Sequence, residues 1–142
     1  MENATDNTVV FLTPVQNNSR PRPHTAPKPI RRAKVNLSEG LDIWHRVTMQ
    51  SVQGDSPDLT SRQMAVLMTV YLSEGPHTVR SLAKHLNVTK AVISRAIDRL
   101  SQYGYVERAP DIRDKRSVIM RRTSGGINYL RDFARLIQTE FA

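Results

Sequence analysis

Residues 82–100, LAKHLNVTKAVISRAIDRL, decide the fold of this chain. Apolar residues recur at helical spacing on both sides of a short break at Asn87 and Val88. Thr89 follows the break and suits a helix N-cap, and Thr78 stands in the same place before the first of the two helices. Two short helices joined by a turn of three or four residues form a helix-turn-helix, whose second helix lies in a DNA major groove.

The second of these helices, expected over 89–103, has two distinct faces. Its inward face is apolar and comprises Val92, Ile93, Ala96, Ile97 and Leu100. Its outward face carries the candidates for DNA contact, which are Thr89, Lys90, Ala91, Ser94, Arg95 and Arg99. Arg95 can bond a guanine edge through two N–H groups, and Ala91 can touch a thymine methyl. Ser94 and Thr89 can bind a base or a phosphate.

Three positions in this motif have alternative roles. Arg99 can contact a phosphate, or it can form an ion pair with Asp98 or Glu107. Thr78 and Ser81, at the start of the first helix, can bind phosphate through the helix N-terminus. They can also simply cap that helix, and the two roles are compatible.

Two strand-like runs follow, around Tyr105–Val106 and 118–120, with a polar connection at 110–115. The connection is too long and too charged for a two-residue hairpin turn, so we expect it to project as a wing over 105–121. The minor groove is only about 6 Å wide, which suits a thin, long cation at the wing tip. The candidates are Arg113, Lys115 and Arg116.

Two acids alternate with these cations in the tip sequence, DIRDKR. Asp111 and Asp114 are expected to hold the loop in shape by pairing with Arg113, Lys115 or Arg116. The narrow groove of A/T-rich DNA would strengthen the attraction of Arg113. The alternative is a solvated charged hairpin tip without a partner.

Helices are expected on both sides of this module. Leu37, Leu41, Trp44 and Val47 follow one another at spacings of four, three and three, which predicts one face of a helix over 37–51, capped by Asn36 or Ser38. A helix over 62–73 should end at Gly75-Pro76, with Gly75 at the C′ position. A last helix, capped by Thr123 or Ser124, runs over 123–141. The dimer candidates on the outer helices are Leu41, Trp44, Ile137 and Phe141.

Charge is distributed unevenly along the chain, which has 142 residues and a formal net charge of +8. Residues 77–122 carry eleven Lys/Arg and four Asp/Glu, for a net charge of +7, and residues 1–36 add +4. The remainder is therefore net −3. A clustered positive charge favours a nucleic-acid partner over an anionic membrane surface.

Residues 1–36 are predicted to form a disordered Pro- and Arg-rich arm in front of a domain over 37–142. Five of the eight prolines lie between Pro14 and Pro29, and residues 20–34 carry six Lys/Arg and no acid. Such a segment buries too little apolar surface to offset its ordering entropy. Two roles stay open: a solubilising tail, or an arm that holds phosphates without sequence preference.

The sequence argues against an enzyme, a metal site and a membrane protein. The absence of cysteine excludes disulfides and thiolate ligands, and the four histidines have no metal-site spacing. There is no nucleophile elbow, phosphate-cradling Gly-rich loop or convergent carboxylate pair. No apolar run approaches the roughly 18 residues of a membrane span, and the N-terminus lacks a secretory pattern. We expect a cytoplasmic, nucleoid-associated protein without a cofactor.

From about residue 59 to 129 the sequence resembles the MarR family of winged helix-turn-helix transcription regulators. The resemblance rests on LAKHLNVTKAVISRAIDRL, on GYVER before the wing, on DIRDKR at the wing tip and on RRTSGG at the last helix, where Arg122 replaces the usual Leu. It implies a mainly α fold with a small β-wing. Family members usually continue into a further dimer-forming segment, whereas this sequence stops at Ala142, and the basic arm is not a family feature.

The pattern therefore predicts a dimeric, sequence-specific DNA-binding regulator, a repressor, on an inverted-repeat operator in double-stranded DNA. Helix 89–103 would lie in the major groove and wing 105–121 in the minor groove. One alternative is an architectural, nucleoid-type DNA binder, which the basic arm favours. Another is a winged-helix adaptor for protein interactions, because a fold does not fix a function. No motif supports a small-molecule effector.

Overall fold

The computed structural model of the protein describes residues 35–141, so most of the predicted basic arm lies outside the described residues. The elements in chain order are α1 (Leu37–Gln53), α2 (Ser61–Leu72), α3 (Val79–Leu86), α4 (Lys90–Gln102), β1 (Val106–Pro110), β2 (Val118–Arg122) and α5 (Ser124–Phe141). The two strands form one antiparallel sheet. The predicted fold class, mainly α with a small β-wing, is confirmed.

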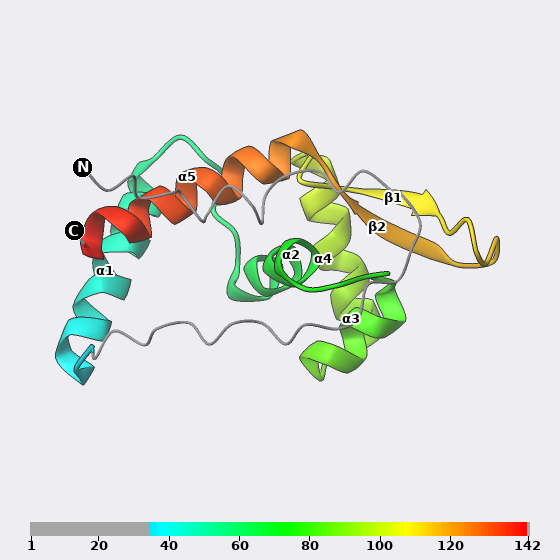
Figure 1. Cartoon of the computed structure of the whole chain (residues 1–142), viewed down its shortest axis with the longest axis horizontal. Coiled ribbons are helices and arrows are strands. Elements are labelled where there is room, and N and C mark those ends of the chain that lie inside the picture. The colour runs from blue at the N-terminus through cyan, green and yellow to red at the C-terminus, as the bar shows by residue number, and fades with distance from the viewer. Residues whose placement is uncertain (1–34, 142) are drawn as a thin grey trace, which may run out of the picture.

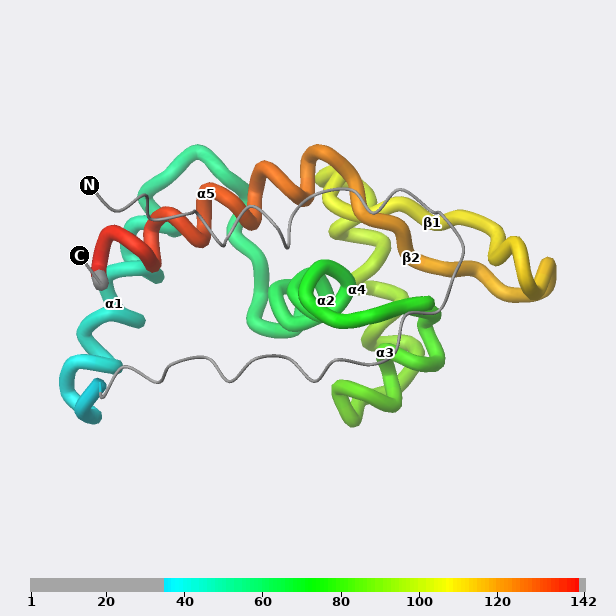
Figure 2. Tube along the Cα trace, in the orientation of Figure 1, coloured from blue at the N-terminus to red at the C-terminus, as the bar shows by residue number. Residues whose placement is uncertain are grey.

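The molecule is elongated, with the wing at one end and α1 at the other (Figures 1 and 2). α2, α3 and α4 lie between them, and α5 runs from the base of the wing to α1. One apolar cluster lies at the centre, with Leu67 and Val66 from α2, Leu82 from α3 and Ile97 from α4 at its most buried points. This core holds the helix-turn-helix and the wing as one unit.

Side-chain caps begin the first two helices, and the cap at Asn36 is one that the sequence predicted. Asn36 caps α1 and Thr60 caps α2, each in a reciprocal box with the residue three positions later. The turn between α3 and α4 is held by Asn87, whose φ of 53° is left-handed and whose type tolerates that conformation. One expectation is wrong: α2 ends at Leu72 with Ser73 as its extended C-cap, so Gly75 lies beyond the C′ position.

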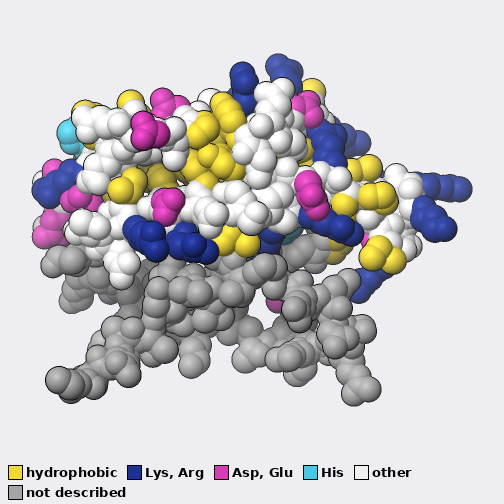
Figure 3. Space-filling view, turned by 90° about the horizontal axis from the view of Figure 1, so that it is seen from above, with side chains coloured by type: hydrophobic (Ala, Val, Ile, Leu, Met, Phe, Trp, Pro, Cys, Tyr) yellow, Lys and Arg dark blue, Asp and Glu magenta, His cyan; other side chains and the backbone are white. Residues whose placement is uncertain are grey.

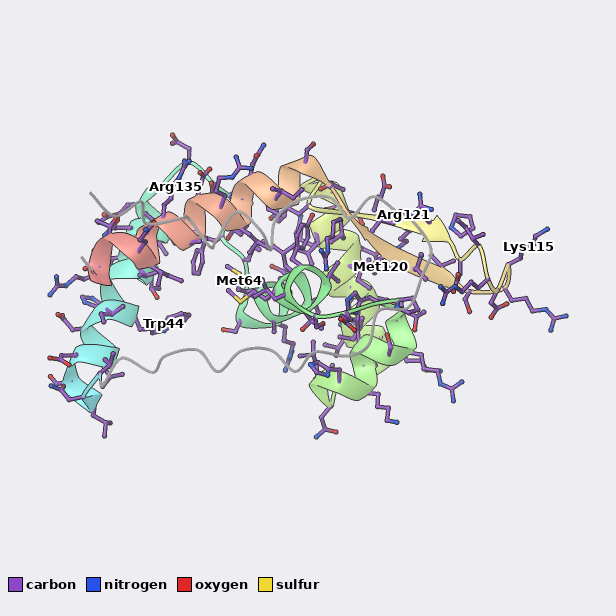
Figure 4. The ribbon with its side chains drawn as sticks, in the orientation of Figure 1. Trp44, Met64, Lys115, Met120, Arg121 and Arg135 are labelled. Atoms are coloured by element: carbon purple, nitrogen blue, oxygen red, sulfur yellow. The ribbon has the colours of Figure 1, made fainter. Side chains whose placement is uncertain are left out.

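The wing is joined to the helix-turn-helix by the segment between α2 and α3. The Met120 N–H donates to the carbonyl of His77 at 2.7 Å, and Thr78 pairs with Ile119 in a β-bridge. Thr78 is also the N-cap of α3. Alternation along β2 turns Met120 inward and Arg121 to the opposite side (Figure 4). The position of the wing is therefore fixed relative to α3.

Arg122, the last residue of β2, binds the C-terminal end of α2. Its Nε donates to the carbonyl of Val70 at 2.9 Å, and its Nη2 donates to that of Ser73 at 3.3 Å. Its guanidinium also lies over the Tyr71 ring, 5.8 Å from the centroid. A cation that binds the last carbonyls of a helix also suits the negative end of the helix dipole. Arg122 thus acts as a cap on the C-terminal end of α2.

α1 packs on α5, and this divides the face predicted for α1. Val47 is buried toward α5, whereas Leu37, Leu41 and Trp44 are 88%, 67% and 60% exposed. Of the four residues predicted on one helix face, only Val47 therefore packs within the chain. No helix within residues 35–141 combines the length and the apolar character needed to cross a membrane.

Glu140 anchors the α1–α5 pair. Its carboxylate accepts hydrogen bonds from Arg46 at 3.3 Å and from Gln50 at 2.9 Å. The Glu140 side chain is only 10% exposed, so its partners offset the cost of burying the carboxylate. Arg46 also pairs with Asp42, and these two carboxylates raise the pKa of Arg46.

Candidate nucleic-acid interface

α4 presents the predicted cationic face to solvent. Ile93, Ala96, Ile97 and Leu100 are buried against the core. Lys90, Ala91, Arg95 and Arg99 are exposed, as is the N-cap Thr89, and Ser94 is half-buried. The two faces are those expected from the apolar spacing, so the side chains proposed to read DNA are accessible. Their contacts with DNA stay predictions.

The hydroxyl groups at the two helix starts act as caps. The Val92 N–H donates to Thr89 Oγ1 at 3.4 Å. Thr78 and Ser81 form a reciprocal box, with each backbone N–H donating to the other side-chain oxygen at 2.9 and 3.0 Å. The Ser81 hydroxyl also donates to the Thr78 carbonyl at 3.1 Å. The capping role of both residues is confirmed, and a phosphate contact stays a prediction.

Arg99 does not form the ion pair considered for it. Its Nη1 donates to Gln102 at 3.2 Å, and its guanidinium lies over the Tyr103 ring at 5.8 Å. Asp98 instead pairs with Arg108 of β1 at 2.5 Å. Asp98 lies one helical turn from Arg95 and links α4 directly to the wing. Arg99 is therefore left for a phosphate contact, which stays a prediction.

The wing tip is braced by its two acids, but not through the cations. Asp111 Oδ1 accepts the Arg113 backbone N–H at 2.9 Å, and Asp114 Oδ1 accepts the Arg116 backbone N–H at 3.0 Å. The Ser117 hydroxyl donates to Asp114 Oδ2 at 2.8 Å. The Ser117 hydroxyl, and to a smaller extent the Arg116 N–H, lower the pKa of Asp114. The expected ion pairs within the tip are wrong, because short carboxylates reach the nearby backbone first.

The three cations of the tip are thereby left to solvent. Arg113, Lys115 and Arg116 are exposed, and none of the ion pairs among the described residues involves them. Lys115 extends from the far end of the hairpin (Figure 4). Lys and Arg side chains gather at this end of the molecule (Figure 3). The tip can thus offer several guanidinium and ammonium groups to a polyanion at once.

Comparisons with known proteins agree with this geometry. Residues 59–118 match the model described as the MarR family. Over 69 residues the chain is 38% identical to the multiple antibiotic resistance protein MarR of Escherichia coli (strain K12), which covers 49% of this chain and 47% of that protein. Over 98 residues it is 32% identical to the uncharacterized HTH-type transcriptional regulator YdgG of Bacillus subtilis (strain 168), covering 68% and 62%. The chain belongs to the MarR family.

This MarR-family chain matches about half the length of the E. coli relative. Its fold is similar to that of S. aureus MepR in a solved MepR–DNA complex, with a TM-score of 0.57 and 21% identity. That similarity covers 72% of this chain and 78% of MepR. The fold is therefore shared with a protein whose structure was solved with DNA.

Sequence reasoning missed several basic residues of this MarR-family domain. Arg80 and Lys84 are exposed on α3, and Arg108 joins the wing to α4. Their contribution to the basic cluster was the only signal in the sequence. Arg121 is exposed on the outer side of the sheet, opposite Glu107 in the register, and Arg122 is turned toward α2. The effective cationic face is thus smaller than the charge count suggested.

A small apolar pocket lies behind α4. It has a volume of about 190 Å³ between α2, the helix-turn-helix turn and α4, with Val66, Leu86, Val88 and Val92 among its lining residues. Because aliphatic side chains form most of its wall, the pocket indicates only that a ligand would have to be small and apolar. Among the described residues, no three His, Asp or Glu side chains gather as a metal site.

Proposed function

We propose that the protein is a sequence-specific DNA-binding transcriptional regulator, a repressor, and not an enzyme. The observation that carries the proposal is the pairing of an exposed cationic face on α4 with a braced cationic wing tip. The DNA in the MepR structure supports the same use of the fold here. Arg95 and its neighbours would read the major groove, and Arg113 would enter the minor groove.

The proposed assembly is a homodimer on an inverted repeat. An exposed apolar stripe runs along α1, through Leu37, Leu41, Trp44 and Val52, and supports pairing with a second copy. Trp44 extends from α1 toward the side of α2 that carries Met64 (Figure 4). Ile137 is half-buried on α5, and the side chain of Phe141 lies outside the described residues. Two-fold symmetry would place half-sites about one helical turn apart.

Sedimentation at micromolar concentration tests the dimer. Leu41→Asp should dissociate it, because the new carboxylate would be buried without a partner. Ser38→Asp, which adds the same charge to α1 beside the stripe, is the matched control and should remain dimeric. A wild-type protein that sediments as a monomer, with and without DNA, contradicts the assembly.

The experiment that tests the function is selection of binding sites from genomic DNA, followed by footprinting on the recovered sites. Protection of discrete inverted repeats supports the proposal. Uniform protection of DNA favours the architectural binder. A DNA affinity that does not depend on salt concentration favours the adaptor. A reporter gene downstream of a recovered site tests repression.

Residues 1–36 are proposed to be a separate basic arm that adds affinity for any DNA. Deletion of residues 1–34 should weaken binding to recovered and random sites by a similar factor. It should also leave the melting temperature of the domain nearly unchanged. Unequal losses would mean that the arm reads sequence. A cytoplasmic, nucleoid-associated location follows from this function, and fluorescence microscopy of a tagged protein tests it.

A further inference from the structure

Ile112, at the tip of the wing, is 76% exposed. Among the large hydrophobic side chains of residues 35–140, only Leu37 is more exposed, at 88%. The α1 stripe and the wing lie at opposite ends of the elongated molecule (Figure 1). An interface built on that stripe therefore leaves the exposure of Ile112 unexplained.

The loop that presents Ile112 is ordered on both sides of it. The Asp111 N–H donates to the Ser117 carbonyl at 2.9 Å, and the Ser117 N–H donates to the Asp114 carbonyl at 2.8 Å. Asp111 also accepts the Arg113 N–H, which closes a turn directly around Ile112. The apolar side chain is thus held out to solvent by a preset turn.

The neighbours of Ile112 indicate what can cover it. Arg113, Lys115 and Arg116 follow it in the same loop, and they too are exposed. A protein partner with an apolar pocket would have to bury or neutralise these cations. A DNA minor groove offers phosphates for the cations, and carbon atoms of deoxyribose and base edges for an aliphatic chain. Apolar side chains beside cations are a recurring feature of minor-groove binding.

We propose that Ile112 packs in the DNA minor groove beside Arg113, against deoxyribose and base-edge carbon atoms. This inference rests on the proposed DNA-binding function and adds an apolar contact to it. The contact releases no counterions, so its contribution to affinity is independent of salt. It also favours sites whose flanks contain deformable pyrimidine–purine steps, where an aliphatic chain enters most easily.

The test is a binding titration at several salt concentrations on a recovered site. Ile112→Ala should lower affinity about 10-fold, the loss expected for partial burial of an aliphatic side chain, with an unchanged log–log salt slope. Ile112→Leu, which keeps the apolar volume, should stay close to wild type. Val118→Ala is the control, because Val118 is also exposed but lies at the start of β2, paired with Pro110.

The outcomes separate this inference from the function on which it rests. Wild-type protein that does not bind DNA overturns both. Wild-type binding with unchanged affinity in Ile112→Ala overturns the inference alone. A loss in Ile112→Ala with a lower salt slope also overturns it, because the loop would then have moved its cations. A defect in self-association with normal DNA affinity would assign Ile112 to a second copy of the chain instead.

Discussion

The Tyr71 hydroxyl accepts a hydrogen bond from the backbone N–H of Thr123 at 2.7 Å, across 52 residues of sequence. The same hydroxyl donates to the Tyr105 carbonyl at 2.8 Å. One buried phenol therefore joins α2, the start of β1 and the start of α5. A Cβ on Gly126 would overlap this hydroxyl and the Tyr105 carbonyl, so only glycine fits there. The wing and α5 are set on the core by this junction.

Tyr71→Phe should lower the free energy of unfolding by about 1–3 kcal/mol, because it leaves the Thr123 N–H and the Tyr105 carbonyl without this partner. Urea unfolding measures the change. Tyr103→Phe is the control: it removes a phenol whose ring is half-buried, and it should change stability by less than about 0.5 kcal/mol. Equal effects of the two variants would mean that the hydroxyl junction adds no stability.

Arg122→Met should lower the free energy of unfolding by about 1–2 kcal/mol, because it removes the cap on the last carbonyls of α2. Methionine keeps much of the aliphatic stem. The salt slope of DNA binding should not change, because the guanidinium is directed at Val70 and Ser73. Arg121→Met, on the outer side of the sheet, is the control and should leave stability nearly unchanged. A reduced salt slope in Arg122→Met would assign Arg122 to DNA.

Stability should decline as the pH falls below about 6.5, the ordinary pKa of histidine. Burial lowers the pKa of His77, and the charges of Arg122 and His85 lower it further, although the bond to the Ser73 carbonyl acts in the opposite direction. As the pH falls, His77 therefore binds a proton in the unfolded chain before it does so in the folded chain. The folded state loses stability between the ordinary histidine pKa and the lower pKa of folded His77. His77→Gln should flatten the decline in urea midpoints, whereas His45→Gln, at an exposed site on α1, should preserve it.

How far the sequence predicts the structure depends on the range of the interaction. The two faces of α4 follow from local apolar spacing, and the caps at Thr78 and Thr89 follow from residue type. The wing follows from two β-branched runs around a charged connection. These features were predictable because each is encoded in a continuous stretch of sequence.

Other features depend on partners far away in sequence. Val47 is buried, unlike the exposed stripe of α1, because α5 packs against α1. Arg122 caps a helix that ends about 50 residues before it. Neither the burial of Val47 nor the cap by Arg122 can be predicted from a local sequence pattern. At the wing tip the sequence identified the two bracing acids correctly. Residue type alone did not show whether their carboxylates would accept from a backbone N–H or from a guanidinium. Only the turn geometry distinguishes them.

Asp111 provides a direct test of that geometry. Asp111→Asn keeps a side-chain oxygen for the Arg113 N–H, so it should bind DNA about as well as wild type, or slightly better for losing a negative charge. Asp111→Ala removes the acceptor and should weaken binding by loosening the loop, although less than Arg113→Ala. Binding titrations rank the three variants. Loss of binding in Asp111→Asn would show that the charge of Asp111, and not its hydrogen bond, holds the tip.

Arg95 and Arg113 are expected to contribute to binding in different ways. Arg95 is exposed on the face of α4 opposite the buried Ala96 and Ile97, where it can reach base edges in the major groove. Arg95→Ala should cost about 1–3 kcal/mol on a recovered site and relax preference at one base position per half-site. Arg113→Ala should lower the magnitude of the log–log salt slope by about 1 per subunit.

Any sequence preference that Arg113→Ala removes should be for A/T-rich flanks, because the minor groove distinguishes little else. Titrations of both variants at several salt concentrations, on recovered and random DNA, separate the two roles. Arg121→Ala is the matched control, since Arg121 is exposed in the same wing but on its outer side, opposite Glu107. Wild-type affinity in both Arg95→Ala and Arg113→Ala, with folding intact, would mean that this face does not bind DNA. The protein-interaction adaptor would then be the better account of this fold.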